Sequence, residues 1–560
     1  VLARAIVPNR SDTAAESRQE THAMEPSSAA AYVVVKFDDR NRFGENGVPA
    51  LRLFSGGARV VVRMKPATIE KAGKRSQCAP RNSQNSATRL FIPHTPLPPC
   101  RYAKVALQEG GAEAQLMELL GVVGEYAAEL RVYQLHFGVK PCRYPAEEAW
   151  ALRPADAEAG GRLDCTHLRV FSVDNASTRD IDDALSLELA AGVADACPAD
   201  DARATSEWAT GVSGTLGVHV ADVASRVPCD SPLFAWAFGR ASSCYHGGVD
   251  GEGPGGSVPM LPPELAHGEL SLNEGARRNA LSVFLRIEGG AVVECWHAQT
   301  SLINNNATTY AAFGQDATPY GRAARALLRR LSGEHEPEEL VAWTMIKYNS
   351  YLGALLSSRG DAGGIPAGAG LLRVQPVANE AATYGAARGA ADARTHAGLA
   401  LVDYAHCSSP IRRYADLHNQ HVLASTLGAG GVLDATRLAV LNERAAQVSH
   451  YHAMTSAMEL AHACRKEPKT FACRVETDED GTALRVYTER GRVKVPLRDS
   501  YFAEPLAAHF AGAAGDVKVQ LYGVLKNGRT QLRVRVQEVA AAALNLRSPL
   551  AAAAPGAPAA

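Results

Sequence analysis

Four aspartates lie close together between two segments whose apolar residues alternate, and this pattern limits what the middle of the chain can fold into. The segment from Leu168 to Val173 precedes the cluster, and Leu185, Leu187 and Leu189 follow it at a period of two. Such alternation is typical of β-strands. The cluster is therefore predicted to occupy a loop between two strands, and its members are Asp174, Asp180, Asp182 and Asp183.

Neighbouring carboxylates repel one another unless cations lie among them. Carboxylate oxygens suit hard ions such as Mg²⁺, which one or two carboxylates hold while waters and substrate phosphates complete the coordination. A calcium loop is excluded because, counted from Asp174, its glycine and glutamate positions hold Arg179 and Leu185. The cluster therefore predicts a divalent-metal site for phosphoryl transfer, with a solvated acidic turn as the alternative.

A second motif, CSSPIRRYADL, predicts the start of a helix, with Ser409 as the N-cap and Pro410 at the first helical position. Arg412 and Arg413 would then stand in the first turn, at the positive end of the helix dipole, and this arrangement favours a bound phosphate. The alternative is a surface ion pair between Arg412 and Asp416, four residues apart.

Composition excludes few classes of function. A net charge of -1 gives no global basic field, so any nucleic-acid surface would have to be local. The 11 cysteines include no CxxC pair, which favours reduced thiols in an intracellular protein over a disulfide framework or a zinc site. No uninterrupted apolar run is long enough to cross a bilayer, so no membrane partner is expected.

A chain of 560 residues has room for several domains. Short alternating runs predict a small barrel beginning near Tyr32 and a five-stranded OB-type barrel over 470–540. Residues 113–130 have helical periodicity, and 166–466 mix strands with long helices, as in an α+β domain.

Taken in order, these motifs resemble the ribonuclease II and ribonuclease R family, whose catalytic domain is the RNB domain. The matching stretches are the four aspartates, Val218–Val223, Val258–Leu261 and Pro262, Leu270–Leu272, Thr309–Tyr310, Met345 with Asn349, His396–Leu399, and Ser409–Tyr414 with Asp416–Leu417. The resemblance implies a multidomain α+β protein. Its expected division is 1–30 as a disordered lead-in, 31–110 as a cold-shock-type OB barrel, 111–165 as a second OB-like region or connector, 166–466 as the RNB catalytic domain, 467–540 as a C-terminal OB barrel and 541–560 as a disordered tail.

The resemblance also implies a processive 3′–5′ exoribonuclease that hydrolyses single-stranded RNA to nucleoside 5′-monophosphates with Mg²⁺, or Mn²⁺, as cofactor. Membership of an RNA-decay complex is left open. It implies that Asp174 and Asp183 bind the metal, that Asp180 supports the metal site and that Asp182 is the catalytic carboxylate. Arg412, with Arg413 beside it, would bind the scissile phosphate. Tyr310 would lie at the terminal nucleotide, and RNA bases would stack on Tyr245.

The chain departs from the family pattern in its substrate channel. Trp343 stands where the family usually carries Glu, and no aromatic partner for Tyr245 is evident. We therefore predict that Trp343 or Tyr348 offers a substitute stacking surface, with a core position as the alternative. Two other functions remain open, a non-catalytic RNA-binding regulator on the same scaffold and a metal phosphodiesterase acting on DNA or a small nucleotide.

Overall fold

The described part of the chain forms two compact units, which we call the sheet unit and the barrel unit. The sheet unit takes its residues from 141–244 and 258–448, and the barrel unit from 16–140, 245–257 and 449–560. The structure is a computed structural model, and it describes residues 33–37, 47–54, 59–63, 101–107, 113–139, 143–154, 161–247, 256–358, 368–378, 380–427, 432–477, 483–488, 491–496, 515–526 and 529–538.

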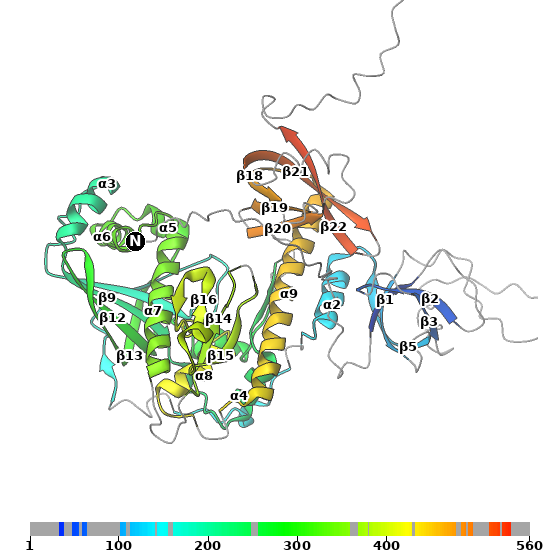
Figure 1. The fold of residues 1–560 in the computed structure, drawn as a ribbon, viewed down its shortest axis with the longest axis horizontal. Coiled ribbons are helices and arrows are strands. Elements are labelled where there is room, and N and C mark those ends of the chain that lie inside the picture. Colours follow the sequence, from blue (N-terminus) through cyan, green and yellow to red (C-terminus); the bar gives the residue numbers. More distant parts are fainter. Residues whose placement is uncertain are drawn as a thin grey trace, which may run out of the picture. The chain divides into compact units, whose positions relative to one another are not determined.

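The sheet unit is built on a sheet of order β12-β9-β8-β7-β13-β6, in which β12 also pairs with β13. The long strand β13 runs antiparallel to β12 in its first part and parallel to β7 at its end. Figure 1 shows β9, β12 and β13 side by side. The strands are β6 (Leu163–Asp164), β7 (Val170–Asp174), β8 (Asp183–Leu189), β9 (Gly214–Ala221), β12 (Arg277–Glu288) and β13 (Ala291–Thr309).

A chain of buried polar side chains crosses four strands of this sheet. His219 of β9 hydrogen-bonds to Ser186 of β8 at 2.9 Å and to Ser282 of β12 at 2.7 Å, and Ser282 reaches Thr300 of β13 at 2.7 Å. Burial lowers the pKa of His219 to about 3, so the ring is neutral at physiological pH. Because a strand shifted by one residue would lose these bonds, the chain of side chains favours the observed register.

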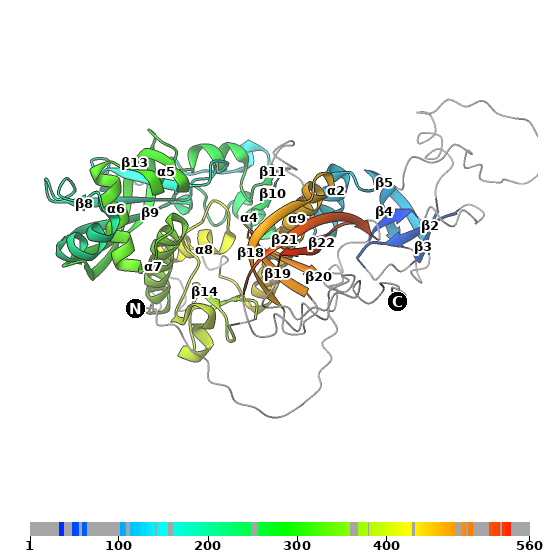
Figure 2. The ribbon, with the colours of Figure 1, turned by 90° about the horizontal axis from the view of Figure 1, so that it is seen from above.

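The helices of the sheet unit start where the sequence supplies caps. The side chains of Ser231, Thr309 and Thr318 each accept a hydrogen bond from a backbone N–H three residues later, and a proline follows Ser231 and Thr318 at the first helical position. Figure 2 shows α6 and α7, which pack against each other. The helices are α3 (Asp201–Arg203), α4 (Pro232–Arg240), α5 (Tyr310–Gln315), α6 (Pro319–Ser332), α7 (Pro337–Ser358) and α8 (Tyr414–Leu423).

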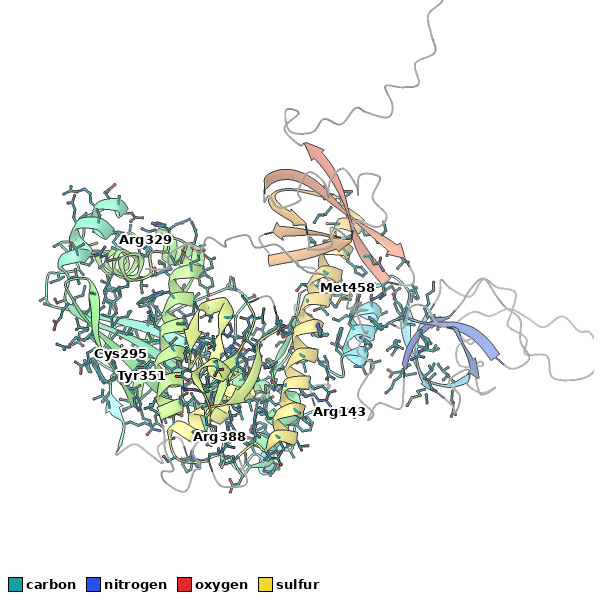
Figure 3. All side chains as sticks on the ribbon, viewed as in Figure 1. Arg143, Cys295, Arg329, Tyr351, Arg388 and Met458 are labelled. Carbon is teal, nitrogen blue, oxygen red and sulfur yellow. The ribbon has the colours of Figure 1, made fainter. Side chains whose placement is uncertain are left out.

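Helix α7 lies against the sheet. The hydroxyl of Tyr348 donates to the carbonyl of Leu281 in β12 at 3.0 Å, and Tyr351 shares a hydrogen bond with His297 of β13. Figure 3 labels Tyr351 and Cys295, which lies two residues before His297 on β13. The short strands between α7 and α8 are β14 (Leu371–Val374), β15 (Thr383–Ala386), β16 (Thr395–His396) and β17 (Leu401–Val402).

The barrel unit contains a closed barrel of order β1-β2-β3-β5-β4 and a five-stranded sheet of order β20-β19-β18-β21-β22. The long helix α9 (Ala435–Lys466) contributes residues to both units. The other elements of the barrel unit are β1 (Val33–Phe37), β2 (Gly47–Arg52), β3 (Arg59–Arg63), β4 (Arg101–Leu107), β5 (Glu113–Val122), α2 (Tyr126–His136), β10 (Cys244–His246), β11 (Gly256–Val258), β18 (Lys469–Thr477), β19 (Ala483–Thr488), β20 (Gly491–Pro496), β21 (Gly515–Lys526) and β22 (Arg529–Glu538).

The predicted helix over 113–130 is wrong. Strand β5 occupies its first part because its backbone pairs with β4 on one side and β3 on the other and so closes the barrel, and helix α2 begins only at Tyr126. The five strands predicted over 470–540 are confirmed. The predictions for 1–30 and 541–560 fall outside the described residues. Within the described ranges, no helix combines the length and apolarity of a membrane span.

Candidate active site

The structure places the four aspartates around one hairpin, as predicted. Asp174 is the last residue of β7, Asp183 is the first residue of β8, and Asp180 and Asp182 lie in the loop between these antiparallel strands. The prediction of a loop between two strands is confirmed. The alternative of a solvated turn does not hold for Asp182, because its side chain is 3% exposed.

Asp182 is held from both of its oxygens. The backbone N–H of Ile411 donates to Oδ1 at 2.9 Å, and Nε of Arg412 donates to Oδ2 at 3.1 Å. Burial raises the pKa of Asp182 well above its ordinary range, while Arg412 and the Ile411 N–H oppose that rise by favouring the carboxylate. The hairpin and the residues around Arg412 therefore meet at a single carboxylate.

Burial is the main cause of the raised pKa values of Asp174 and Asp183, and neighbouring carboxylates add to it only at Asp174. Burial raises the pKa of Asp183 to about 6, against the opposing effect of the Arg412 and Arg413 guanidiniums. Burial first, and then the charges of Asp183 and Asp180, raise the pKa of Asp174 to about 7. A bound cation would favour the charged forms of both carboxylates against burial, and at Asp174 also against the neighbouring negative charges.

Tyr310 stands next to these aspartates in the fold. Thr309, which caps α5 by accepting the N–H of Ala312 at 3.2 Å, pairs in register with Asp174 of β7. Burial and the negative charges of Asp183 and Asp174 raise the pKa of Tyr310 to about 12. Its phenol is therefore a neutral hydrogen-bond donor at physiological pH.

The predicted helix start at Ser409 and Pro410 is wrong, because α8 begins four residues later, at Tyr414. Residues 410–412 form a turn, and the cap position is Arg413, whose extended backbone forms a bridge with Ser242. We call residues 409–413 the arginine turn. Arg412 and Arg413 precede α8, so they do not lie in the first turn of a helix as predicted.

Each arginine of this turn has its own carboxylate. Nη2 of Arg412 donates to Oγ of Ser409 at 2.8 Å while its Nε binds Asp182. Nη2 of Arg413 donates to the fully buried Asp416 at 2.7 Å. The alternative of an exposed pair between Arg412 and Asp416 is therefore wrong, since a neighbouring arginine takes that partner and the pair is buried.

Asn349 of α7 positions the segment that enters the arginine turn. Its amide nitrogen donates to the hydroxyls of Tyr404 at 3.2 Å and Ser408 at 3.1 Å, and its oxygen accepts the N–H of Cys407 at 2.8 Å. Gln420 of α8 acts similarly on the hairpin side. Its amide donates to the carbonyl of Ala221, and the N–H of Ala221 donates to the carbonyl of Asp182. These amides were not singled out as site residues by sequence reasoning, although Asn349 stood in a recognised motif.

Tyr245 belongs to the barrel unit, and there its partner is His452 of α9. The N–H of Tyr245 donates to Nε2 of His452 at 3.0 Å, and the two ring centroids are 6.0 Å apart. Both side chains are partly exposed. Sequence reasoning missed His452, because nothing in the pattern of α9 distinguishes it from its neighbours.

The prediction of a substitute stacking surface is wrong for Tyr348, which is fully buried under β12. Trp343 is half-buried and packs against the core of the sheet unit, and the ammonium of Lys347 lies 5.5 Å from the centroid of its ring. The core and Lys347 therefore cover part of the Trp343 ring, and less of the ring is open for stacking with an RNA base.

The donor chemistry of the hairpin fits a hard divalent cation. In the described chain, no group of three or more His, Cys, Asp or Glu side chains is assembled as a metal site. Mg²⁺ does not need such a group, because one or two carboxylates suffice when water and substrate phosphates supply the other ligands. Asp174 and Asp183, the last residue of β7 and the first residue of β8, meet that requirement.

Comparisons with known proteins support the resemblance. Residues 162–313 and 372–429 match the family model described as the RNB domain. Ribonuclease R of Chlamydia pneumoniae is 28% identical over 184 residues, which cover 32% of this chain and 23% of that relative. The chain therefore spans about a quarter of the length of this curated relative.

Solved structures share the fold over most of the chain. Ribonuclease R of Mycoplasma genitalium in its apo form gives a TM-score of 0.58 at 14% identity and covers 90% of this chain and 89% of its own. Yeast Ssd1, a pseudonuclease, gives a TM-score of 0.60 at 12% identity and covers 91% of this chain and 83% of its own. The fold is thus common to a nuclease and a pseudonuclease, and it does not by itself establish activity.

Proposed function

We propose that this chain, which belongs to the RNB-domain family of ribonucleases, is a metal-dependent 3′–5′ exoribonuclease that hydrolyses single-stranded RNA processively to nucleoside 5′-monophosphates. The observation that carries the proposal is the buried Asp182 between Arg412 and the Ile411 N–H, on a hairpin that retains Asp174 and Asp183. A chain that only bound RNA would have no need for this costly group of carboxylates.

In this proposal the aspartates, Arg412 and Tyr310 have different roles. Asp174 and Asp183, supported by Asp180, would hold Mg²⁺ or Mn²⁺, which when bound supplies an activated water and neutralises charge on the phosphate. Arg412 is 41% exposed, so a phosphate can approach its guanidinium while Asp182 holds the other edge. Tyr310 can donate a hydrogen bond to the terminal nucleotide.

RNA binding is assigned mainly to the barrel unit. The strand order β1-β2-β3-β5-β4 and the C-terminal five-stranded sheet support two OB-type barrels, which bind single strands by backbone charge and base stacking. We propose Tyr245 as a stacking residue, with His452 as its ring partner. The domain division suggested by the sequence is part of this proposal, with β5 now inside the first barrel.

The test is hydrolysis of RNA and DNA of equal sequence, each labelled at its 5′ end, with Mg²⁺ and with EDTA. We expect full-length RNA to be converted into short 5′-labelled products with few intermediates, nucleoside 5′-monophosphates to appear as the unlabelled product by chromatography, and EDTA to abolish an activity that Mg²⁺ or Mn²⁺ restores. Equal hydrolysis of DNA would favour a general phosphodiesterase.

The second candidate is a non-catalytic RNA-binding regulator. Two observations favour it, namely the pseudonuclease among the structural neighbours and the ion pair that already occupies Asp182. The same experiment separates the candidates, because the regulator would leave the RNA intact with either divalent ion.

A further inference from the structure

Arg373 of β14 lies in a cross-strand row between two tyrosines. Strand β14 pairs with β15 so that Arg373 faces Tyr384, and the N–H of Arg373 donates to the carbonyl of Tyr404 at 2.7 Å. Its guanidinium carbon lies 4.8 Å from the centroid of the Tyr384 ring. Strand β14 packs beside α8, the helix that follows the arginine turn (Figure 1).

Both tyrosines are fixed by hydrogen bonds. Tyr404 accepts the amide of Asn349 at 3.2 Å, and the hydroxyl of Tyr384 shares a hydrogen bond of 2.9 Å with Nδ1 of His406. Both rings are at least nine-tenths buried, whereas Arg373 is only partly buried. The row therefore presents an oriented guanidinium on a rigid aromatic support.

The two arginines near Arg373 each have a carboxylate of their own. Arg412 is paired with Asp182, and Arg413 is paired with Asp416. Within the residues that the structure describes, Arg373 has no carboxylate partner. Burial lowers its pKa, and the like charge of Arg413 adds to that effect.

The neighbouring histidines add no positive charge around Arg373. Burial, followed by the charges of Arg413 and Arg373, lowers the pKa of His406 well below its ordinary range. Burial also lowers the pKa of His396. Both rings are neutral at physiological pH, so neither is a charged neighbour of Arg373. A guanidinium that is oriented by its support and has no carboxylate of its own is suited to an anion with paired oxygens.

We propose that Arg373 binds a backbone phosphate of the RNA strand, at a linkage other than the one that Arg412 holds for cleavage. This assignment rests on the proposed function, because the strand must pass the arginine turn to reach Asp182. Arg373 is thus a binding and positioning residue, and it takes no part in bond breaking. A phosphodiester is the ligand that supplies one negative charge to each site along a chain.

The first test compares Arg373→Gln with wild type and with Arg330→Gln, a matched change at an exposed arginine of α6. Binding of single-stranded RNA is measured in EDTA over a series of salt concentrations, so that the result does not depend on hydrolysis. We expect Arg373→Gln to weaken binding about 10-fold or more and to reduce the slope of log K against log salt by about 0.7, the value for one phosphate on a single strand. Arg330→Gln should leave both unchanged.

The second test identifies the phosphate. RNAs that carry one uncharged methylphosphonate linkage, moved position by position, are bound to wild type and to Arg373→Gln. We expect one linkage at which wild type loses affinity and Arg373→Gln does not. If both proteins respond alike at every linkage, or if the salt slope of the variant is unchanged, the proposal is overturned even when hydrolysis is normal.

Two controls separate the charge of Arg373 from its fork geometry, and a backbone phosphate from the nucleotide product. Arg373→Lys keeps the charge but not the fork, so it should keep the wild-type salt slope while binding more weakly; a slope reduced as in Arg373→Gln would contradict a charge contact. Competition by a nucleoside 5′-monophosphate should be equal in wild type and Arg373→Gln, and loss of competition in the variant would assign Arg373 to the product instead. Failure of the proposed function appears separately, as RNA binding without hydrolysis.

Discussion

Two buried carboxylates, Asp182 in the sheet unit and Glu129 in the barrel unit, are held by the same kinds of donor. Each accepts one hydrogen bond from a backbone N–H and one from a basic side chain. For Asp182 these donors are Ile411 and Arg412, and for Glu129 they are Thr530 and His462. They differ in the exposure of the basic partner. The side chain of Arg412 is 41% exposed, whereas that of His462 is 7% exposed.

This difference separates a reactive site from a structural one. Both oxygens of Glu129 are occupied, since Thr530 also donates its hydroxyl at 2.8 Å, and the cluster joins α2, α9 and β22 away from solvent. Asp182 is similarly buried, but its partner is partly exposed to solvent, and two further carboxylates with raised pKa values, Asp174 and Asp183, lie on the same hairpin. Exposure of the basic partner and further carboxylates with raised pKa values therefore indicate function better than burial of one carboxylate does.

The largest effect is expected for Asp182→Asn. The amide keeps the size of the side chain but removes the charge that Arg412 and the hairpin are arranged around, so turnover should fall roughly 10³- to 10⁴-fold, the scale seen when a buried active-site aspartate becomes asparagine. RNA binding in EDTA should stay within a few-fold of wild type. Asp195→Asn, at an exposed position, is the control. Hydrolysis near the wild-type rate would remove Asp182 from the mechanism.

Arg412→Ala should have the next largest effect. Because the guanidinium would stabilise charge on the phosphate, its removal should lower turnover about 10²- to 10³-fold. Arg412→Lys should recover only part of this loss, since a point charge cannot contact Asp182 and a phosphate as a planar fork does. If the alanine variant turns over normally at saturating RNA and only its KM rises, Arg412 contributes uniform binding.

The hairpin could be predicted from the sequence because its evidence is local. Alternation of apolar residues placed Asp174 and Asp183 at strand ends, and the residue types indicated the chemistry. The arginine turn could not be predicted in the same way. The local signal at Ser409 and Pro410 favours a helix start, but a bridge from Arg413 to Ser242, far away in the sequence, keeps the backbone extended.

The Glu129 cluster had no local signal at all. Its three residues come from α2, α9 and β22, and no periodicity joins them. The same holds for His452 beside Tyr245 and for Arg373 between Tyr384 and Tyr404, where the arrangement follows from strand pairing and helix packing. Motifs identify residues that act with their sequence neighbours, whereas contacts between distant segments need the fold.

Glu129→Gln tests the closed side of the comparison. The amide has one oxygen instead of two, so it cannot accept the hydrogen bonds of both Thr530 and His462. One buried donor then loses its partner, and the free energy of unfolding should fall by about 1 to 3 kcal/mol. Turnover at saturating RNA, measured below the melting temperature, should not change. Glu118→Gln, on the exposed face of β5, is the control for stability. Loss of turnover with an intact fold would show that the closed cluster also serves the reaction.

The smallest effect concerns pH and divalent ions. The pKa values of Asp174 and Asp183 are about 7 and about 6, above the unfolded value of 3.8, so the folded chain binds protons that the unfolded chain releases. Their contribution to stability is present below the unfolded pKa and is lost as the pH rises toward 7. A cation replaces the lost protons. Mg²⁺ should therefore raise the melting temperature more at pH 8 than at pH 5.5, by a few degrees at most.

Variants at the two carboxylate sites separate this ion effect from general stabilisation. Asp174→Asn should lose the response to Mg²⁺, whereas Glu188→Gln, exposed on the same hairpin, and Glu129→Gln, in the closed cluster, should keep it. The reason is that, of these two sites, the hairpin has several carboxylates with raised pKa values and a basic partner that is exposed to solvent. An equal Mg²⁺ response in Asp174→Asn would mean that the ion binds elsewhere, and the contrast between the open and the closed carboxylate would then lose its electrostatic basis.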